Sequence, residues 1–139
     1  MKANDFVVLA LRSPLQAIMG DLMLITLNGR KTGRRITLPV NYYLDGDSLW
    51  IISSRSRTWW RNLTQGAQVN VRLHGRDLEG FGEAILDEKA VANRMMDYVC
   101  RLPASARHLG LRVENGVPNS EDIARAARER LFVRICVEG

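Results

Sequence analysis

The sequence predicts a mainly β protein with appended helices, of the α+β class, whose central unit is an antiparallel barrel. Several segments alternate apolar and polar residues with the period of a half-buried strand. Short turns such as Asp45-Gly46 join these segments into three hairpin-like pairs. The regular strand–helix–strand alternation of a parallel sheet is missing. About six strands with glycines inside one of them favour a curling, closed antiparallel sheet.

One domain covering residues 1–139 is expected. The chain has 139 residues, of which 46% are hydrophobic, and this is enough for a single sizeable core. No repeat, low-complexity tract or linker divides it.

The first half of the chain predicts two short helices followed by three strands. Asn4 or Asp5 can cap the first helix, and Ser13 followed by Pro14 is typical of the start of a second one. The next three segments alternate or are continuously apolar, and a glycine-bounded turn and Asp45-Gly46 separate them. We expect helices over 4–12 and 13–20, and strands over 23–28, 36–44 and 49–53.

The second half predicts three helices and three strands. Thr58 is a capping residue and Gly66 a terminating one for a short helix, and Asp87 caps a longer helix that Pro103 ends. In the last helix, acidic residues open the first turn, and Arg128 and Arg130 occupy the last turn, where they complement the helix dipole. We expect helices over 58–66, 87–102 and 120–130, and strands over 69–73, 78–86 and 131–137.

Positive charge is concentrated in one part of the chain. Residues 22–76 contain nine basic and two acidic side chains, whereas the rest of the chain contains eleven basic and thirteen acidic ones. One face or cleft should therefore be strongly positive, which suits a polyanionic ligand. Nucleic-acid binding explains the same asymmetry, but no nucleic-acid motif supports it, so none is expected as a partner.

Two basic segments lie in loops between predicted elements. In the first, residues 29–35 (GRKTGRR), glycines let backbone amides turn towards a ligand. A strand follows, so the segment is not a Walker loop. The second, residues 53–63 (SSRSRTWWRNL), enters a helix N-terminus, which favours anions. Trp59 and Trp60 would point about 100° apart on a helix, so at most one should face the core. Solvated charges and ordinary tryptophan packing are the alternatives.

Other kinds of site are not encoded. The histidines are isolated and the two cysteines are far apart in sequence, so no metal site and no redox CxxC pair is expected. No nucleophile motif and no paired carboxylates are visible, so the chemistry of an enzyme here would belong to a cofactor. No apolar stretch reaches the roughly 20 residues of a membrane span, and no signal peptide is recognisable. The expected location is the cytoplasm.

The motifs GRKTGR (29–34), TLPV (37–40), DGD (45–47) and TWWRNL (58–63) occur in this order and resemble the deazaflavin-dependent nitroreductase family. That family is similar to the pyridoxamine-phosphate-oxidase-like, FMN-binding split β-barrels. The resemblance covers about residues 22–82. The chain departs from the family at Ile36, where many members have an arginine, and at Ser54–Arg57, where an SKGG-like element is expected.

The resemblance implies a cofactor site for coenzyme F420, with FMN as the alternative. Lys31 and its neighbours would contact the anionic tail, Pro39 and Val40 would lie against the ring, and residues 53–57 would hold the phosphate and the ring edge. Asn62 and the two tryptophans would shape the adjacent helix. The implied cofactor-binding residues are Arg30, Lys31, Thr32, Gly33, Arg34, Arg35, Pro39, Val40, Ser53, Ser54, Arg55, Ser56, Arg57, Trp59, Trp60 and Asn62.

The expected function is hydride transfer from reduced coenzyme F420 to a small electrophilic acceptor such as a quinone, a nitro compound or an activated alkene. Solvent or a tyrosine hydroxyl would supply the accompanying proton. The alternatives are an FMN-dependent reductase and a non-catalytic carrier of a fatty acid or cofactor with the same fold. Related split barrels commonly dimerise, so a homodimer is a further expectation.

Overall fold

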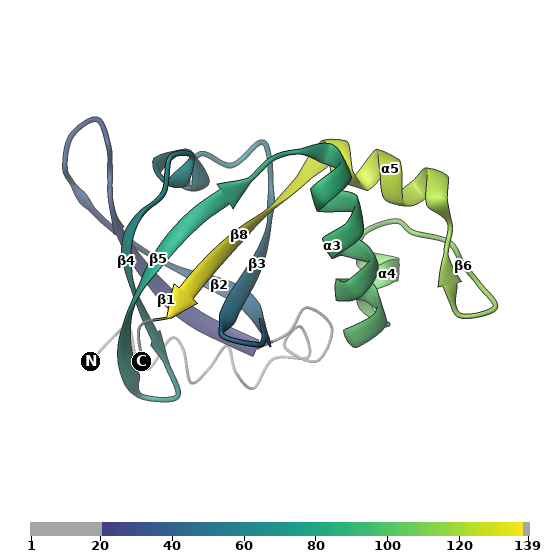
Figure 1. Ribbon diagram of the computed structural model, residues 1–139, viewed down its shortest axis with the longest axis horizontal. Helices are drawn as coiled ribbons and strands as arrows, with labels where there is room; N and C mark the ends of the chain where they lie inside the picture. Colours follow the sequence, from purple (N-terminus) through teal and green to yellow (C-terminus); the bar gives the residue numbers. More distant parts are fainter. Residues whose placement is uncertain (1–20, 138–139) are drawn as a thin grey trace.

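A computed structural model describes residues 21–137, and the helices expected over 4–12 and 13–20 lie outside this range. Six antiparallel strands close into a barrel in the order β1-β2-β3-β8-β5-β4 (Figure 1). The barrel strands are β1 (Asp21–Asn28), β2 (Arg35–Asp45), β3 (Ser48–Ser54), β4 (Ala67–Leu73), β5 (Arg76–Ile85) and β8 (Arg130–Val137). The split-barrel fold class predicted from the sequence is confirmed.

The interior of the barrel is apolar because one side of every strand carries its hydrophobic residues. In β2, for example, Val40 and Tyr42 face inwards and are buried. Thr37 and Pro39, which lie nearer to the turn between β1 and β2, are exposed. Strand alternation thus places the barrel core on the side that the period of two predicts. A five-residue 3₁₀-helix, η1 (Trp59–Leu63), packs its buried side chains against the same core.

The barrel is open at two places where neighbouring strands separate. β2 and β3 pair only next to their turn, from Tyr43–Trp50 to Asp45–Ser48, and part beyond Tyr43. β1 and β4 pair over three residues only, from Leu24–Arg72 to Thr26–Asn70. Pro39 lies in the unpaired part of β2, where the missing amide hydrogen of proline breaks no ladder to β3. The two openings define where a ligand can reach the barrel.

Three helices cover the outer side of β3 and β8 (Figure 1). They are α3 (Glu88–Arg101), α4 (Ser105–His108) and α5 (Ser120–Glu129). Phe132 of β8 is fully buried beneath them, with its ring 6.0 Å from that of Tyr98 and 6.3 Å from that of Trp50. This second apolar cluster joins the helices to the barrel.

Ionic contacts also attach α3 to the turn between β2 and β3. Arg94 donates to Asp45 at 2.7 Å, and Arg101 donates to the same carboxylate at 3.0 Å. The hydrogen bond from Arg94 is the main cause of a lowered pKa of Asp45. The Arg94 guanidinium also lies 3.8 Å from the ring centroid of Trp50, so its charge is stacked on an aromatic face.

Most predicted elements are present, with shifted ends, but several details differ, among them the short helix α4, which was not expected. The helix expected over 58–66 is the shorter η1, and Trp59 and Trp60 are both buried in the barrel core, so the expectation that at most one faces the core is wrong. Arg130 belongs to β8 and not to the last turn of α5. The hairpin of β6 (Val113–Glu114) and β7 (Val117–Pro118) was not expected, although its Asn115-Gly116 turn is a strong hairpin signal.

Substitution of Gly80 by alanine is expected to destabilise the barrel by about 1–3 kcal/mol. An added Cβ would lie 2.8 Å from the carbonyl oxygen of Cys136, and a main-chain atom of the neighbouring strand cannot move aside cheaply. Gly82→Ala is the matched control on the same strand, since its nearest neighbour is a valine methyl at 3.3 Å. Urea unfolding of both variants checks this, and equal stability losses would contradict it.

Candidate functional site

A cavity of about 190 Å³ lies where β2 and β3 separate. Residues from the separated parts of both strands line it, together with residues from the loop after β3, from η1 and from the start of β8. The lining residues are Pro39, Val40, Asn41, Ile52, Ser53, Ser54, Arg57, Trp59 and Arg130. The TLPV and SSRSRTW motifs, distant in sequence, thus meet at one place.

Polar groups of the inner wall of the cavity form hydrogen bonds with one another. The buried Trp59 donates its indole N–H to the Ser53 hydroxyl at 3.2 Å. The Ser54 and Ser56 hydroxyls are 2.8 Å apart, and the Ser56 amide also donates to Ser54. These contacts explain why serines occupy this turn.

Two arginines give the cavity its charge. Arg57 is exposed and Arg130 half-buried, and among residues 21–137 neither guanidinium has a hydrogen bond or an ion pair. No carboxylate of the described residues lines the cavity. The charge of Arg130 also opposes the effect of burial, which raises the pKa of Tyr98. Unpaired guanidiniums at a cavity with polar walls favour an anionic ligand.

Arg55 has a structural task that the sequence did not reveal. Its guanidinium donates to the carbonyl oxygens of Leu86 at 2.6 Å, Arg130 at 2.8 Å and Ala127 at 3.0 Å. It therefore satisfies carbonyls at the end of α5 and joins that helix to the barrel. Arg55 does not line the cavity. The expectation of a direct ligand contact from Arg55 has no support in its geometry.

The basic hairpin between β1 and β2, residues 29–34, lies beside η1 (Figure 1). The Arg30 amide donates to the side-chain oxygen of Asn62 at 2.9 Å, and Asn62 in turn donates to the carbonyl of Trp59. Arg30, Lys31, Thr32, Gly33 and Arg34 are all exposed, and none lines the cavity. Asn62 therefore holds an exposed cationic loop next to the helix that forms one cavity wall.

Arg35 lies elsewhere. It lines a groove of about 440 Å³ at the other barrel opening, with side chains of β1, β4 and β5 that include Asn28, Asn70 and Glu79. Strand alternation places Arg35 on the outer face of the sheet, away from the inward-facing Ile36. The structure does not bring Arg35 together with the other predicted site residues.

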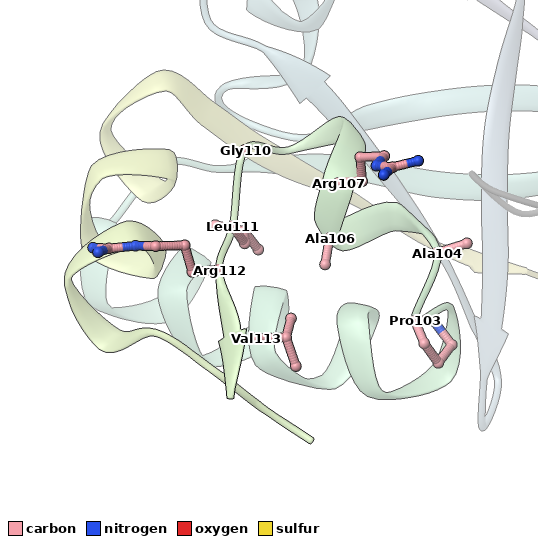
Figure 2. A pocket seen from close by; sticks show the side chains of 8 residues that line it. All are labelled: Pro103, Ala104, Ala106, Arg107, Gly110, Leu111, Arg112 and Val113. Carbon is pink, nitrogen blue, oxygen red and sulfur yellow. The ribbon is translucent and has the colours of Figure 1, made fainter. Parts of the chain in front are cut away.

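A larger hollow of about 630 Å³ lies between α4 and the segment that leads to β6 (Figure 2). Its walls are mostly apolar, from residues such as Pro103, Ala106 and Leu111. Figure 2 shows the Arg112 side chain directed away from the hollow, and it pairs with Asp122 of α5 at 2.9 Å. No residue predicted from the sequence motifs lines this hollow, so it is not the candidate site.

Two further findings concern other kinds of site. Within residues 21–137, no group of three or more histidine, cysteine, aspartate or glutamate side chains is arranged to hold a metal ion. In the same part of the chain, no helix combines the length and apolar character that crossing a bilayer would need.

The cavity was foreseen only in part. The motifs provided Pro39, Val40, Ser53, Ser54, Arg57 and Trp59, but sequence reasoning missed Asn41, Ile52 and Arg130. Asn41 and Ile52 follow from the strand pairing once it is known. Arg130 had no sequence signal of its own, since it resembles any cation at a helix end.

The fold and the open cavity define the class of the protein as a split β-barrel. A protein of unknown function from Agrobacterium tumefaciens is 17% identical with a TM-score of 0.58, and the match covers 85% of this chain but only 48% of that one. A conserved hypothetical protein from Mycobacterium tuberculosis is 14% identical with a TM-score of 0.58, and the match covers 100% of this chain and 82% of that one. A protein from Listeria innocua assigned as a pyridoxamine 5'-phosphate oxidase is 11% identical with a TM-score of 0.54, and the match covers 95% of this chain and 91% of that one.

The family is more specific. Residues 10–110 match the model of the F420H(2)-dependent quinone reductases, which is well over half of the chain. The chain belongs to this family, so it is an oxidoreductase that uses coenzyme F420. Among curated proteins, none matches the chain significantly. The family resemblance drawn from the motifs is confirmed.

The residues present fit such a cofactor. The cavity offers an apolar side formed by Val40 and Trp59 for a planar ring, and two arginines with no acidic partner in the described part of the chain for its anionic part. At about 190 Å³ it is smaller than the roughly 300–1,000 Å³ of pockets that enclose a whole ligand. It can therefore take only part of the molecule, and the exposed basic hairpin is the adjoining surface.

Proposed function

We propose that the protein transfers hydride from reduced coenzyme F420 to a small electrophilic acceptor, with a quinone as the first candidate. The observation that carries this proposal is the cavity between β2 and β3, where family motifs meet two arginines that have no side-chain partner among residues 21–137. The bound coenzyme would supply the hydride, while the chain would supply binding, orientation and charge.

Each group of residues has a distinct task in this proposal. Val40 and Trp59 form the apolar side against which a planar ring packs, and Pro39 borders the opening. The Ser53–Trp59 hydrogen bond keeps this wall in place. Lys31, Arg30 and Arg34 attract the anionic tail from the loop beside η1. Holding the two reactants at near-attack distance lowers the barrier by several kcal/mol.

Water supplies the proton that accompanies the hydride in this proposal. Burial raises the pKa of Tyr42 and of Tyr43 to about 12, so neither hydroxyl gives up its proton readily near neutral pH. The Tyr43 hydroxyl donates to Asp97 and accepts from Arg94, away from the cavity. None of the three tyrosines lines the cavity, whereas its mouth between β2 and β3 is open.

Titration of the purified protein with coenzyme F420 and with FMN tests the choice of cofactor. Quenching of the ligand fluorescence gives both dissociation constants, and the reduced cofactor that binds more tightly is then mixed with a quinone. We expect tighter binding of coenzyme F420 and oxidation of its reduced form by the quinone. Tighter binding of FMN, or binding of a fatty acid with no turnover, would favour the corresponding alternative.

Substitution of Lys31 by alanine is expected to weaken the binding of coenzyme F420 about tenfold or more, because charge-assisted hydrogen bonds to the tail contribute roughly 1.5–3 kcal/mol each. Lys89→Ala, which removes an exposed lysine from α3, is the matched control. Fluorescence titration measures both. An affinity like that of the wild type in the Lys31 variant would remove this residue from the site.

Three expectations remain predictions: one domain over residues 1–139, a location in the cytoplasm and a homodimer. Sedimentation of the purified protein measures the last of these directly.

A further inference from the structure

The C-terminal strand contributes a cation to the site that the family match does not include. Arg130 lies outside residues 10–110, and it lines the same cavity as Arg57 and Ser54. In the barrel, Arg130 and Ser54 are directly paired on neighbouring strands, so their side chains lie on the same side of the sheet. This side is the mouth of the cavity, opposite the inward-facing Ser53.

The position of Arg130 is fixed by Arg55. The Arg55 guanidinium donates to the Arg130 carbonyl at 2.8 Å, and the Arg55 amide donates to the carbonyl of the preceding residue, Glu129, at 3.0 Å. Arg55 therefore holds the peptide groups on both sides of Arg130, at the start of β8. Within the described residues, the Arg130 guanidinium itself has no hydrogen bond or ion pair.

We infer that Arg130 and Arg57 together bind an oxyanion at the mouth of the cavity, and that this oxyanion is the phosphate of the cofactor. The inference rests on the proposed function and adds a specific ligand to it. Arg57 and Arg130 line the same cavity, no carboxylate of residues 21–137 lines it, and guanidinium groups are strong donors to phosphate oxygens. Arg55, which the motif pattern placed at the ligand, acts instead through the backbone of Arg130.

Ligand pairs that differ in the phosphate test this assignment. The Arg130→Gln variant is titrated with the deazaflavin chromophore and with its phosphate monoester, two ligands that differ only in the phosphate, and both are followed by fluorescence. We expect affinity for the phosphate monoester to fall about tenfold or more, and affinity for the chromophore to change less than about twofold. Arg128→Gln is the matched control, because Arg128 is exposed on α5 and does not line the cavity.

Equal losses for the two ligands, or no loss for either, would overturn the assignment of Arg130 to the phosphate. A loss as large in the Arg128 variant would also overturn it, since a general change in charge would then explain the result.

A second measurement separates failure of this inference from failure of the proposed function. If the wild type binds neither coenzyme F420 nor FMN, the proposed function fails, and inorganic phosphate alone then tests the oxyanion site. We expect phosphate to raise the unfolding temperature of the wild type and of the Arg128 variant more than that of the Arg130 variant. An equal rise in all three proteins, or none in the wild type, would overturn the oxyanion site.

Discussion

Replacement of Phe132 by alanine is expected to lower the free energy of unfolding by about 3–5 kcal/mol. Phe132 is 0% exposed, and it pairs with Ile52 of β3 on one side and with Ile85 of β5 on the other. Its ring also touches the cluster beneath the helices, near Tyr98. Truncation leaves a cavity where two layers meet, and neither the barrel nor α3 can collapse into it.

Urea unfolding followed by circular dichroism measures this loss. Phe81→Ala is the matched control, because Phe81 is 43% exposed on the outer face of β5. Its replacement should cost less than about 1 kcal/mol. Similar losses for both phenylalanines would show that burial between the barrel and the helices is not what stabilises this fold.

Substitution of Asp122 by asparagine is expected to lower the unfolding temperature by several degrees at neutral pH. Asp122 is 3% exposed, and its carboxylate accepts hydrogen bonds from the Arg112 amide and side chain and from Arg125. The bonds from Arg112 are the main reason that the pKa of Asp122 is lowered to about 2. The bridge ties α5 to the segment before β6. Arg112 and Arg125 are themselves exposed to solvent, which moderates the effect.

The pH dependence gives this prediction its sign. A carboxylate whose pKa is lowered by folding stabilises the folded state fully at pH values above its pKa in the unfolded chain, which is near 4. It loses this contribution as the pH falls through its pKa in the folded protein, which is about 2. The difference in unfolding temperature between the wild type and Asp122→Asn should therefore be constant from pH 5 to 7 and disappear near pH 2.

Asp77→Asn is the control, since that carboxylate is 57% exposed in its pair with Arg72 and should matter little. A difference for Asp122→Asn that persists unchanged at the lowest pH would exclude the carboxylate as its source.

The strands and the long helix could be predicted because each shows its own local signal. Alternation defines β2 by its inward residues, and Asp87 does cap α3 by accepting from the Ala90 amide at 3.0 Å. The 3₁₀ form of η1 has no comparable signal: Trp59 and Trp60 are both drawn into the barrel core, and this tertiary packing decides the helix type.

The site was harder to predict because it depends on pairings between distant segments. Composition distinguishes neither Arg55 from Arg57 nor Arg130 from Arg128. Only the fold shows that Arg55 faces the carbonyls at the end of α5, whereas Arg57 and Arg130 reach the cavity. Residue types thus indicated an anion site, and the pairing of β3 with β8 determines which cations belong to it.

The indole of Trp59 gives this enzyme an optical probe of its own cavity. It lines the cavity and is held in one orientation by its bond to Ser53. Trp50, by contrast, lies on the outer side of β3 beneath a guanidinium, where a ligand in the cavity does not touch it. A planar cofactor that packs against this indole should therefore quench the emission of Trp59, so ligand binding can be followed without any label.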